Sequence, residues 1–133
     1  VRPISSFTFS SAVANGSTSA TLTWTAATGA ATYDAEYGTS SGSYIGTITN
    51  ITSPYTNNTL PANTTLYVRI KARNAVGAGT LVNSSELSLK TSPTAPTGLT
   101  ATATTSQVQL SWTGSTGATA YRIYRGTTSG SLS

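Results

Sequence analysis

The chain has 133 residues, of which 37% are hydrophobic and only 8% are charged, and it contains no His and no Cys. Without His or Cys, a Ser-His-Asp triad, a His-based metal site and a thiolate nucleophile are excluded within this chain. No apolar run approaches the about 18 residues that a membrane helix needs. The seven basic and three acidic residues, a net charge of +4, lack the concentrated basic face of a nucleic-acid-binding protein. We therefore expect no cofactor, no nucleic-acid partner and no membrane insertion.

One block of sequence occurs twice. Residues 24–44 return without a gap at residues 112–132, so that equivalent positions lie 88 residues apart. A period of this size, built from short β-like runs, predicts one module that starts twice. We therefore predict one module at residues 1–92 and the first half of a second at residues 93–133. Because the first residue is Val1 and not Met, we also expect the chain to be a segment of a longer protein.

Apolar and polar residues alternate along most of the first copy, which is the period-two pattern of half-buried strands. The expected strands cover, in chain order, residues 4–13, 20–25, 33–37, 44–51, 53–57, 66–73 and 87–90. The residues expected to face inward are Phe7, Phe9, Leu22, Trp24, Tyr33, Ala35, Tyr37, Leu66, Val68, Ile70, Ala72, Leu87 and Leu89. Residues 74–79 are expected to form a loop. No segment keeps helical spacing of its apolar residues for three turns, so we predict no helix.

Seven short strands with turn signals at roughly ten-residue spacing predict an all-β fold, an antiparallel β-sandwich. Trp24, Tyr33, the corner at Leu60 and the Ala-Arg-Asn-Ala-Val-Gly sequence at residues 72–77 resemble the fibronectin type III domain, an immunoglobulin-like sandwich. The resemblance covers residues 1–92 and implies a non-enzymatic extracellular module.

The second copy is similar to the fibronectin type III version found in bacterial or archaeal secreted proteins. The similarity rests on Ala-Pro at residues 95–96, Val-Gln-Leu-Ser-Trp at 108–112 and Tyr-Arg-Ile-Tyr at 121–124, and it covers the first three strands only. The resemblance implies core anchors at Trp24, Tyr33, Leu60, Trp112 and Tyr121. The position at which this family places its corner Tyr falls on Leu66, with Tyr67 one step out of phase, so we expect the corner hydroxyl bond to be missing.

The incomplete second copy predicts an open half-sandwich. Its expected apolar face consists of Leu99, Val108, Leu110, Trp112, Tyr121 and Ile123. Such a face exposes apolar surface and unpaired strand edges. Either the rest of the module lies outside this sequence, or another chain supplies the missing strands, as neighbouring subunits of a fibre do by strand addition. Pro93 and Pro96 predict an extended, semi-rigid linker between the two copies.

Asp34 and Glu36 are the only closely spaced carboxylates. At positions i and i+2 of a strand they lie about 7 Å apart on one face, near the spacing of the paired acids of glycosidases. The same face of the neighbouring strand carries Arg69, Lys71 and Arg73, so cross-strand ion pairs account for both acids. A flat, exposed face also offers no cleft that would raise a carboxyl pKa. We therefore predict ion pairs and no enzyme activity.

Five of the seven Asn residues stand in Asn-X-Ser/Thr sequons, at Asn15, Asn50, Asn57, Asn63 and Asn83. Two interpretations are open. In a glycosylating host these turns carry N-linked glycans that solubilise a surface poor in charge. Alternatively, Asn occurs there because it suits the backbone conformations of turns.

The sequence predicts a structural or adhesive module of an extracellular surface protein or filament, acting as a stiff spacer and a protein-protein interaction unit. The predicted interaction face consists of Tyr67, Arg69, Lys71 and Arg73. Its expected partners are other protein subunits or neighbouring modules, with carbohydrate as a further possibility at Tyr67 and Tyr124. The main alternative is an accessory spacer of a secreted polysaccharide-degrading enzyme, and flanking sequence would separate the two functions.

Overall fold

Antiparallel strands and their connections make up the whole described chain in the computed structural model, which describes residues 3–75 and 77–133. The backbone divides into two compact units, Val1–Thr94 and Ala95–Ser133, close to the predicted division between residues 92 and 93. Within the described residues no helix is long and apolar enough to cross a membrane. Each unit is considered by itself below.

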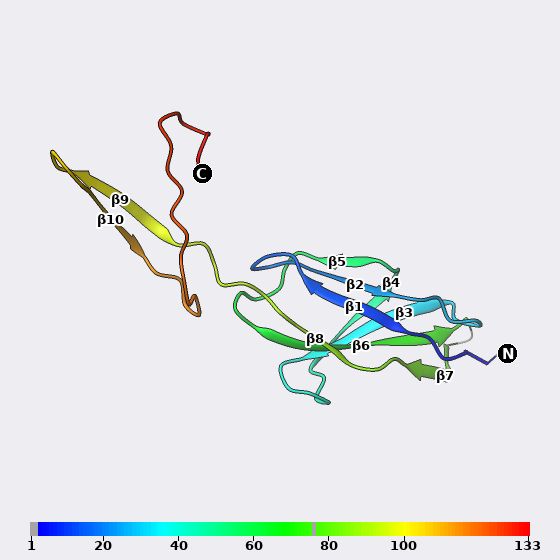
Figure 1. The fold of residues 1–133 in the computed structure, drawn as a ribbon. Coiled ribbons are helices and arrows are strands. Elements are labelled where there is room, and N and C mark those ends of the chain that lie inside the picture. The colour runs from blue at the N-terminus through cyan, green and yellow to red at the C-terminus, as the bar shows by residue number, and fades with distance from the viewer. Residues whose placement is uncertain (1–2, 76) are drawn as a thin grey trace. The chain divides into compact units, whose positions relative to one another are not determined.

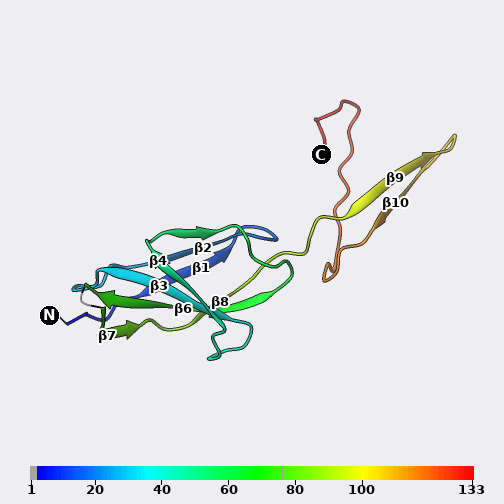
Figure 2. The same cartoon turned by 180° about the vertical axis from the view of Figure 1, so that it is seen from behind.

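The described part of the first unit contains eight strands (Figure 1). They are β1 (Phe9–Ala14), β2 (Ala20–Trp24), β3 (Thr32–Gly38), β4 (Gly46–Ile51), β5 (Tyr55–Asn57), β6 (Thr65–Asn74), β7 (Gly77–Asn83) and β8 (Leu87–Lys90). One sheet has the order β1-β2-β5, and the other has the order β4-β3-β6-β7 with β8 also paired to β6. Seen from both sides, the two sheets form two layers (Figure 2). The all-β antiparallel sandwich is therefore confirmed.

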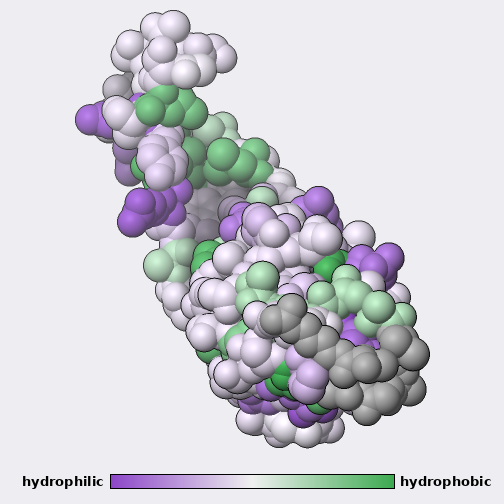
Figure 3. All heavy atoms as spheres, turned by 90° about the vertical axis from the view of Figure 1, so that its right-hand side faces the viewer, coloured by the Kyte–Doolittle hydropathy of each residue, from purple (hydrophilic) through white to green (hydrophobic). Residues whose placement is uncertain are grey.

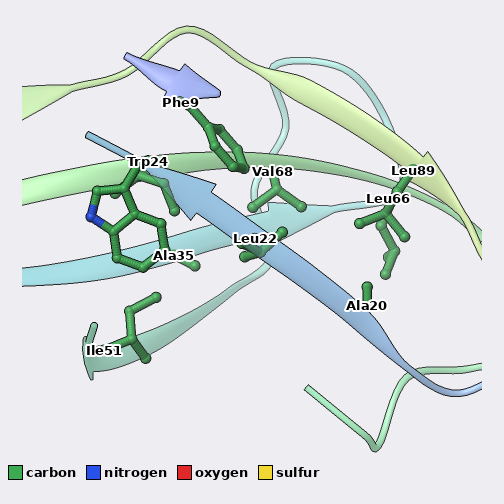
Figure 4. Close-up of a cluster of buried hydrophobic side chains, with 10 residues drawn as sticks. Phe9, Ala20, Leu22, Trp24, Ala35, Ile51, Leu66, Val68 and Leu89 are labelled. Carbon is green, nitrogen blue, oxygen red and sulfur yellow. The ribbon is translucent and has the colours of Figure 1, made fainter. Parts of the chain in front are cut away.

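The core lies between the two sheets and is built by the alternation of β2 and β6. Leu22 and Trp24 of β2 and Val68 and Ile70 of β6 are buried, and with Phe9 of β1 they belong to one apolar cluster. Figure 4 shows Phe9, Leu22 and Val68 directed into the space between the strands. Along β6 every second residue is buried, from Leu66 to Asn74, so the predicted inward positions of this strand are confirmed.

Two expectations about strand ends were wrong. The first strand begins at Phe9, not at residue 4, because Ile4 leaves the sheet register and is buried in a second small cluster with Ala27 and Ala72. The predicted loop at residues 74–79 is short, since β7 already begins at Gly77. Val76, which was placed in that loop and in the family-like ending, lies outside the described residues.

The predicted last strand, residues 87–90, is β8, and β7, which the sequence did not predict, is separated from it by a local change of register. Lys71 of β6 pairs with Asn83, whereas Val68 pairs with Leu87, so two residues of β6 stand opposite three of the other strand. Ser84 bridges the break. Its backbone N–H donates to the Ile70 carbonyl, and its hydroxyl oxygen accepts from the Ile70 N–H. An extra residue of this kind bends a strand and redirects its side chains. Here it turns Glu86 out of the regular alternation.

The second unit contains β9 (Thr97–Ala103) and β10 (Val108–Thr113), paired antiparallel. The third strand expected around Tyr121 has no ladder partner within the described residues of this unit. An extended segment needs a neighbour to satisfy its backbone groups, and in the first unit β6 serves that purpose for β3. The expected first three strands of the second copy are therefore two strands and an unpaired segment.

Local geometry nevertheless follows the sequence repeat closely. The rings of Trp24 and Tyr33 lie 5.5 Å apart, and those of Trp112 and Tyr121 lie 5.4 Å apart. The Tyr33 hydroxyl accepts a hydrogen bond from the N–H of Ala27 at 2.8 Å, and the Tyr121 hydroxyl accepts one from Ser115 at 2.9 Å. The intervening turns share a glycine with positive φ, 87° at Gly29 and 84° at Gly117. We call this arrangement of ring pair and hydroxyl the Trp-Tyr clasp.

Core burial predicts that alanine substitutions at two isoleucines lower stability by very different amounts. Ile70→Ala should lower the free energy of unfolding by about 2–5 kcal/mol, because the side chain is fully buried and its loss leaves a cavity. The matched control is Ile45→Ala, at a residue that is 74% exposed, and it should change stability by less than about 0.5 kcal/mol. Urea denaturation followed by circular dichroism measures both. Equal effects of the two substitutions would contradict the described core.

Candidate interaction surfaces

The outer faces of β3 and β6 bring together the charged residues that the sequence singled out. In the antiparallel register Asp34 stands opposite Lys71 and Glu36 opposite Arg69. The Glu36 carboxylate forms ion pairs with Arg69 Nε at 2.9 Å and Lys71 Nζ at 3.3 Å. Arg73 Nε donates to the Asp34 carboxylate. The predicted cross-strand ion pairs are therefore confirmed, and they link two neighbouring strands of the sheet.

Each of the two carboxylates of this face is bound by more than one donor. The Asp34 side chain is only 3% exposed, and besides Arg73 it accepts a hydrogen bond from the Asn50 N–H at 2.9 Å. Partial burial acts to raise the pKa of Glu36, but the hydrogen bonds from Arg69 and Lys71 outweigh it and lower this pKa overall. A general acid needs a raised pKa, whereas the pKa of Glu36 is lowered, so Glu36 does not suit that role.

Glu86 forms a second polar cluster that the sequence did not reveal. Its carboxylate accepts hydrogen bonds from the Ser41 hydroxyl, from the Gly42 N–H at 2.8 Å and from the Tyr44 hydroxyl. The Arg69 guanidinium lies 4.4 Å from the centre of the Tyr44 ring and so joins this cluster to the ion pairs of β3 and β6. Glu86 thereby fastens the loop between β3 and β4 to the start of β8.

The loop reaches Glu86 because Gly38 allows it to fold tightly. A Cβ at residue 38 would lie 1.9 Å from the Ser43 carbonyl oxygen, so no larger residue fits there. Hydrogen bonds, first of all that of Ser41, lower the pKa of Glu86, while burial and the Glu86 carboxylate raise the pKa of Tyr44 to about 12. Glu86 is separated from the loop by more than forty residues in sequence, and the register change that redirects it leaves no trace in the alternation.

The charged residues of the predicted interaction face, Arg69, Lys71 and Arg73, are engaged in ion pairs. The three acids of the chain are Asp34 and Glu36 of β3, which contact Arg69, Lys71 and Arg73, and Glu86, which lies just before β8 and belongs to the cluster that Arg69 borders. This face is therefore close to neutral, with Tyr67 half-buried beside it. The remaining basic residues in the sequence are Arg2, Lys90, Arg122 and Arg125. On the face drawn in Figure 3, pale areas of intermediate hydropathy cover most of the surface, in keeping with the many Ser and Thr residues of the sequence.

The second unit presents an open apolar groove of about 550 Å³. Leu99 is 70% exposed, Ile123 is 61% exposed and Tyr121 is 39% exposed, although the repeat places them at core positions. Trp112 is half-buried by its contact with Tyr121. The groove is lined by Pro96, Leu99, Leu110, Trp112, Ala120, Tyr121, Arg122, Ile123, Tyr124 and Leu132.

The remaining predicted anchors differ in burial. Trp24 is buried, and both Tyr33 and Leu60 are partly buried against the main core. Leu66 is buried at the corner position and Tyr67 lies outside it, in the register that the sequence indicates. In the second unit Trp112 and Tyr121 hold each other, but they lack the cover that the opposite sheet gives to Trp24.

The five sequons fall into two groups by exposure. Asn15, Asn50 and Asn83 are exposed. Asn57 and Asn63 are half-buried, and the Asn57 side-chain oxygen accepts hydrogen bonds from the N–H and the hydroxyl of Thr59. Glycan attachment therefore meets less steric hindrance at the first three sites.

Fold and surfaces together define an immunoglobulin-like β-sandwich in which Asp34 and Glu36 of β3 form ion pairs with basic residues of β6. Among solved structures, the chain is similar to an Fn3-like protein from Clostridium thermocellum, with 36% sequence identity and a TM-score of 0.53. The match covers 65% of this chain and 88% of that one. No family model and no curated protein matches. The chain thus belongs to the fibronectin type III-like (Fn3-like) family.

The Glu86 cluster predicts a loop that is released by acid. Because the folded-state pKa of Glu36 and of Glu86 is lowered, their ionised forms stabilise the fold above the unfolded pKa of about 4.3, and this contribution is lost as pH falls through the folded pKa. Glu86→Gln should make the Gly42 amide exchange severalfold faster at neutral pH and weaken the loss of stability in acid.

Hydrogen exchange by NMR and urea denaturation between pH 7 and pH 3 measure these effects. The matched control is Lys90→Gln, which removes an exposed charge from the strand that follows Glu86 and should leave Gly42 exchange unchanged. Unchanged Gly42 exchange in Glu86→Gln would show that the cluster does not hold the loop.

Proposed function

We propose that this chain is a non-enzymatic structural module of an extracellular surface protein or filament, acting as a stiff spacer and as a protein-protein interaction unit. The observation that carries the proposal is the Fn3-like sandwich whose carboxylates are all engaged by cations, hydroxyls or backbone N–H groups. Such a module supplies length and surface, and its carboxylates hold neighbouring strands and the loop between β3 and β4 in place. The proposal rests on these engaged groups as well as on the family, because this fold hosts many roles and does not define a function by itself.

The spacer role is supported by the way the chain leaves the first unit. Thr91 is only 1% exposed, and its hydroxyl donates to the Pro61 carbonyl at 2.7 Å and accepts from the Thr64 N–H at 3.0 Å. Ser92 is bonded through its backbone to Gly16. The linker therefore starts from a fixed point on the sandwich, and Pro93 and Pro96 restrict its first residues.

The interaction role is supported by the open groove of the second unit. Exposed apolar surface beside an unpaired extended segment favours association with a further strand. The partners proposed are therefore other protein subunits or neighbouring modules. Tyr124, which is 57% exposed, stays a candidate contact for carbohydrate.

Cell-surface labelling tests the location. Antibodies raised against the 133-residue chain should label intact cells of the producing organism, or filaments isolated from them, as strongly as permeabilised cells. An antibody against a cytoplasmic protein serves as the control and should label only permeabilised cells. Labelling that requires permeabilisation would overturn the extracellular role.

We further propose that the exposed sequons carry N-linked glycans when the protein is made in a glycosylating host. Peptide mass spectrometry of the secreted protein should find higher occupancy at Asn15, Asn50 and Asn83 than at Asn57 and Asn63, because the first three are exposed.

The matched control is Ser85→Ala, which removes the sequon of Asn83 and leaves the Asn in place. It should abolish modification of Asn83 and leave Asn15 unchanged. Unmodified Asn15, Asn50 and Asn83, or preferential modification of Asn63, would contradict the proposal.

A further inference from the structure

The turn between β1 and β2 contains the one Asn-Gly pair of the sequence, Asn15-Gly16. Asn15 is exposed, and its backbone N–H donates to the Ser19 carbonyl at 2.8 Å, which closes the hairpin. Among the described residues the N–H of Gly16 has no hydrogen-bond partner. A Cβ at residue 16 would meet nothing within 4 Å, so the space around this nitrogen is open. The backbone nitrogen that follows the Asn15 side chain is therefore neither bonded nor crowded.

Such a nitrogen can react with the asparagine side chain that precedes it. It loses its proton to solvent and bonds to the side-chain Cγ, the Cγ–Nδ2 bond breaks, and Nδ2 leaves as ammonia after taking a proton from water. Water then opens the cyclic succinimide at either carbonyl, which gives aspartate or isoaspartate. The Asn15 Nδ2 donates to the Thr21 hydroxyl at 2.7 Å, but this bond is exposed and water competes for both groups. The carboxamide is therefore free to turn toward the nitrogen.

The other exposed asparagines are followed by nitrogens that are occupied or crowded. Asn58 precedes Thr59, whose N–H donates to a side-chain oxygen at 2.8 Å. Asn83 precedes Ser84, whose N–H donates to a backbone carbonyl of β6 at 2.8 Å. Asn50 precedes an isoleucine, and a β-branched side chain restricts the approach to its own backbone nitrogen. Of the exposed asparagines in the described chain, only the one in the β1–β2 turn precedes an open nitrogen.

The same turn fastens the point at which the chain leaves the first unit. The Gly16 carbonyl accepts from the Ser92 N–H at 3.0 Å, and the Ser92 carbonyl accepts from the Asn63 N–H at 2.9 Å. An isoaspartate carries the main chain through the side-chain carbon, which adds a methylene group to the backbone before Gly16. Because backbone dimensions are otherwise fixed, the longer turn moves the Gly16 carbonyl away from the Ser92 N–H.

We propose that Asn15 is a site of spontaneous deamidation, through a succinimide formed with the Gly16 nitrogen, and that the isoaspartate product releases Ser92 from the turn. The reaction consumes only water and adds one negative charge to a chain that has few charges. A glycan on Asn15 prevents it, because Nδ2 is then substituted and cannot leave as ammonia. The inference does not depend on the proposed structural role.

The first test follows each asparagine while the unglycosylated 133-residue protein ages at mildly alkaline pH. Peptide mass spectrometry with electron-transfer fragmentation separates aspartate from isoaspartate. Asn15 should be converted to both products severalfold faster than the three internal controls, Asn50, Asn58 and Asn83. Conversion of Asn15 at the rate of the controls, or no conversion, would overturn the site.

Ageing the same protein in urea separates the effect of the fold from that of the local sequence. Unfolding frees the N–H groups of Thr59 and Ser84, so Asn58 and Asn83 should react faster relative to Asn15 than they do in the folded protein. Rate ratios that urea leaves unchanged would show that the hydrogen bonds of the fold do not select the site.

Hydrogen exchange by NMR tests the consequence for the chain exit. In the isolated isoaspartate form the Ser92 amide should exchange severalfold faster than in fresh protein, because its bond to the turn is lost. The Thr91 amide, which donates to the Thr64 carbonyl at 3.0 Å, should change less. The matched control is Asn15→Asp, which adds the same charge without lengthening the backbone and should leave Ser92 exchange unchanged.

Two results would overturn this consequence. Unchanged Ser92 exchange in the isoaspartate form would show that the longer turn keeps its bond to Ser92. An equal increase in Asn15→Asp would assign the release to the new charge and not to the added methylene group.

Discussion

The pairing of β3 with β6 is the constraint on which the rest of the first unit depends. Its seven-residue register places Ala35 against Ile70 on one face and Glu36 against Arg69 on the other. Because side chains alternate between faces, a slip of one residue would bury the charges and expose the core. The ion pairs therefore do more than add a few tenths of a kcal/mol each, since they oppose every alternative register.

Much of this arrangement could be predicted from the sequence because two-residue periodicity is a local property. The alternation from Leu66 to Ala72 identifies both faces of β6, and Asp34 and Glu36 identify the complementary face of β3. The repeat likewise locates the second clasp, because a Trp and a Tyr nine residues apart, with a glycine turn between them, keep the same conformation in both copies.

What the sequence could not reveal depends on contacts between distant segments. Glu86 meets Ser41 and Tyr44 only because the strand opposite β6 gains a residue between Asn83 and Leu87, and no alternation marks that insertion. The surroundings of Arg69 were missed for a related reason. Alternation indicates that Arg69 points outward and can pair with Glu36, but it does not show that Tyr44, held by Glu86, lies against the guanidinium.

The Trp-Tyr clasp has a consequence for the order of assembly. It closes a loop of only nine residues, and it has the same ring separation whether or not an opposite sheet covers it, 5.5 Å in one copy and 5.4 Å in the other. Short loops are cheap in entropy and close quickly, in less than about a microsecond for ten residues. Within the first unit the two rings are therefore free to meet as soon as Tyr33 has been synthesised, and the rate of that contact does not depend on β6 to β8.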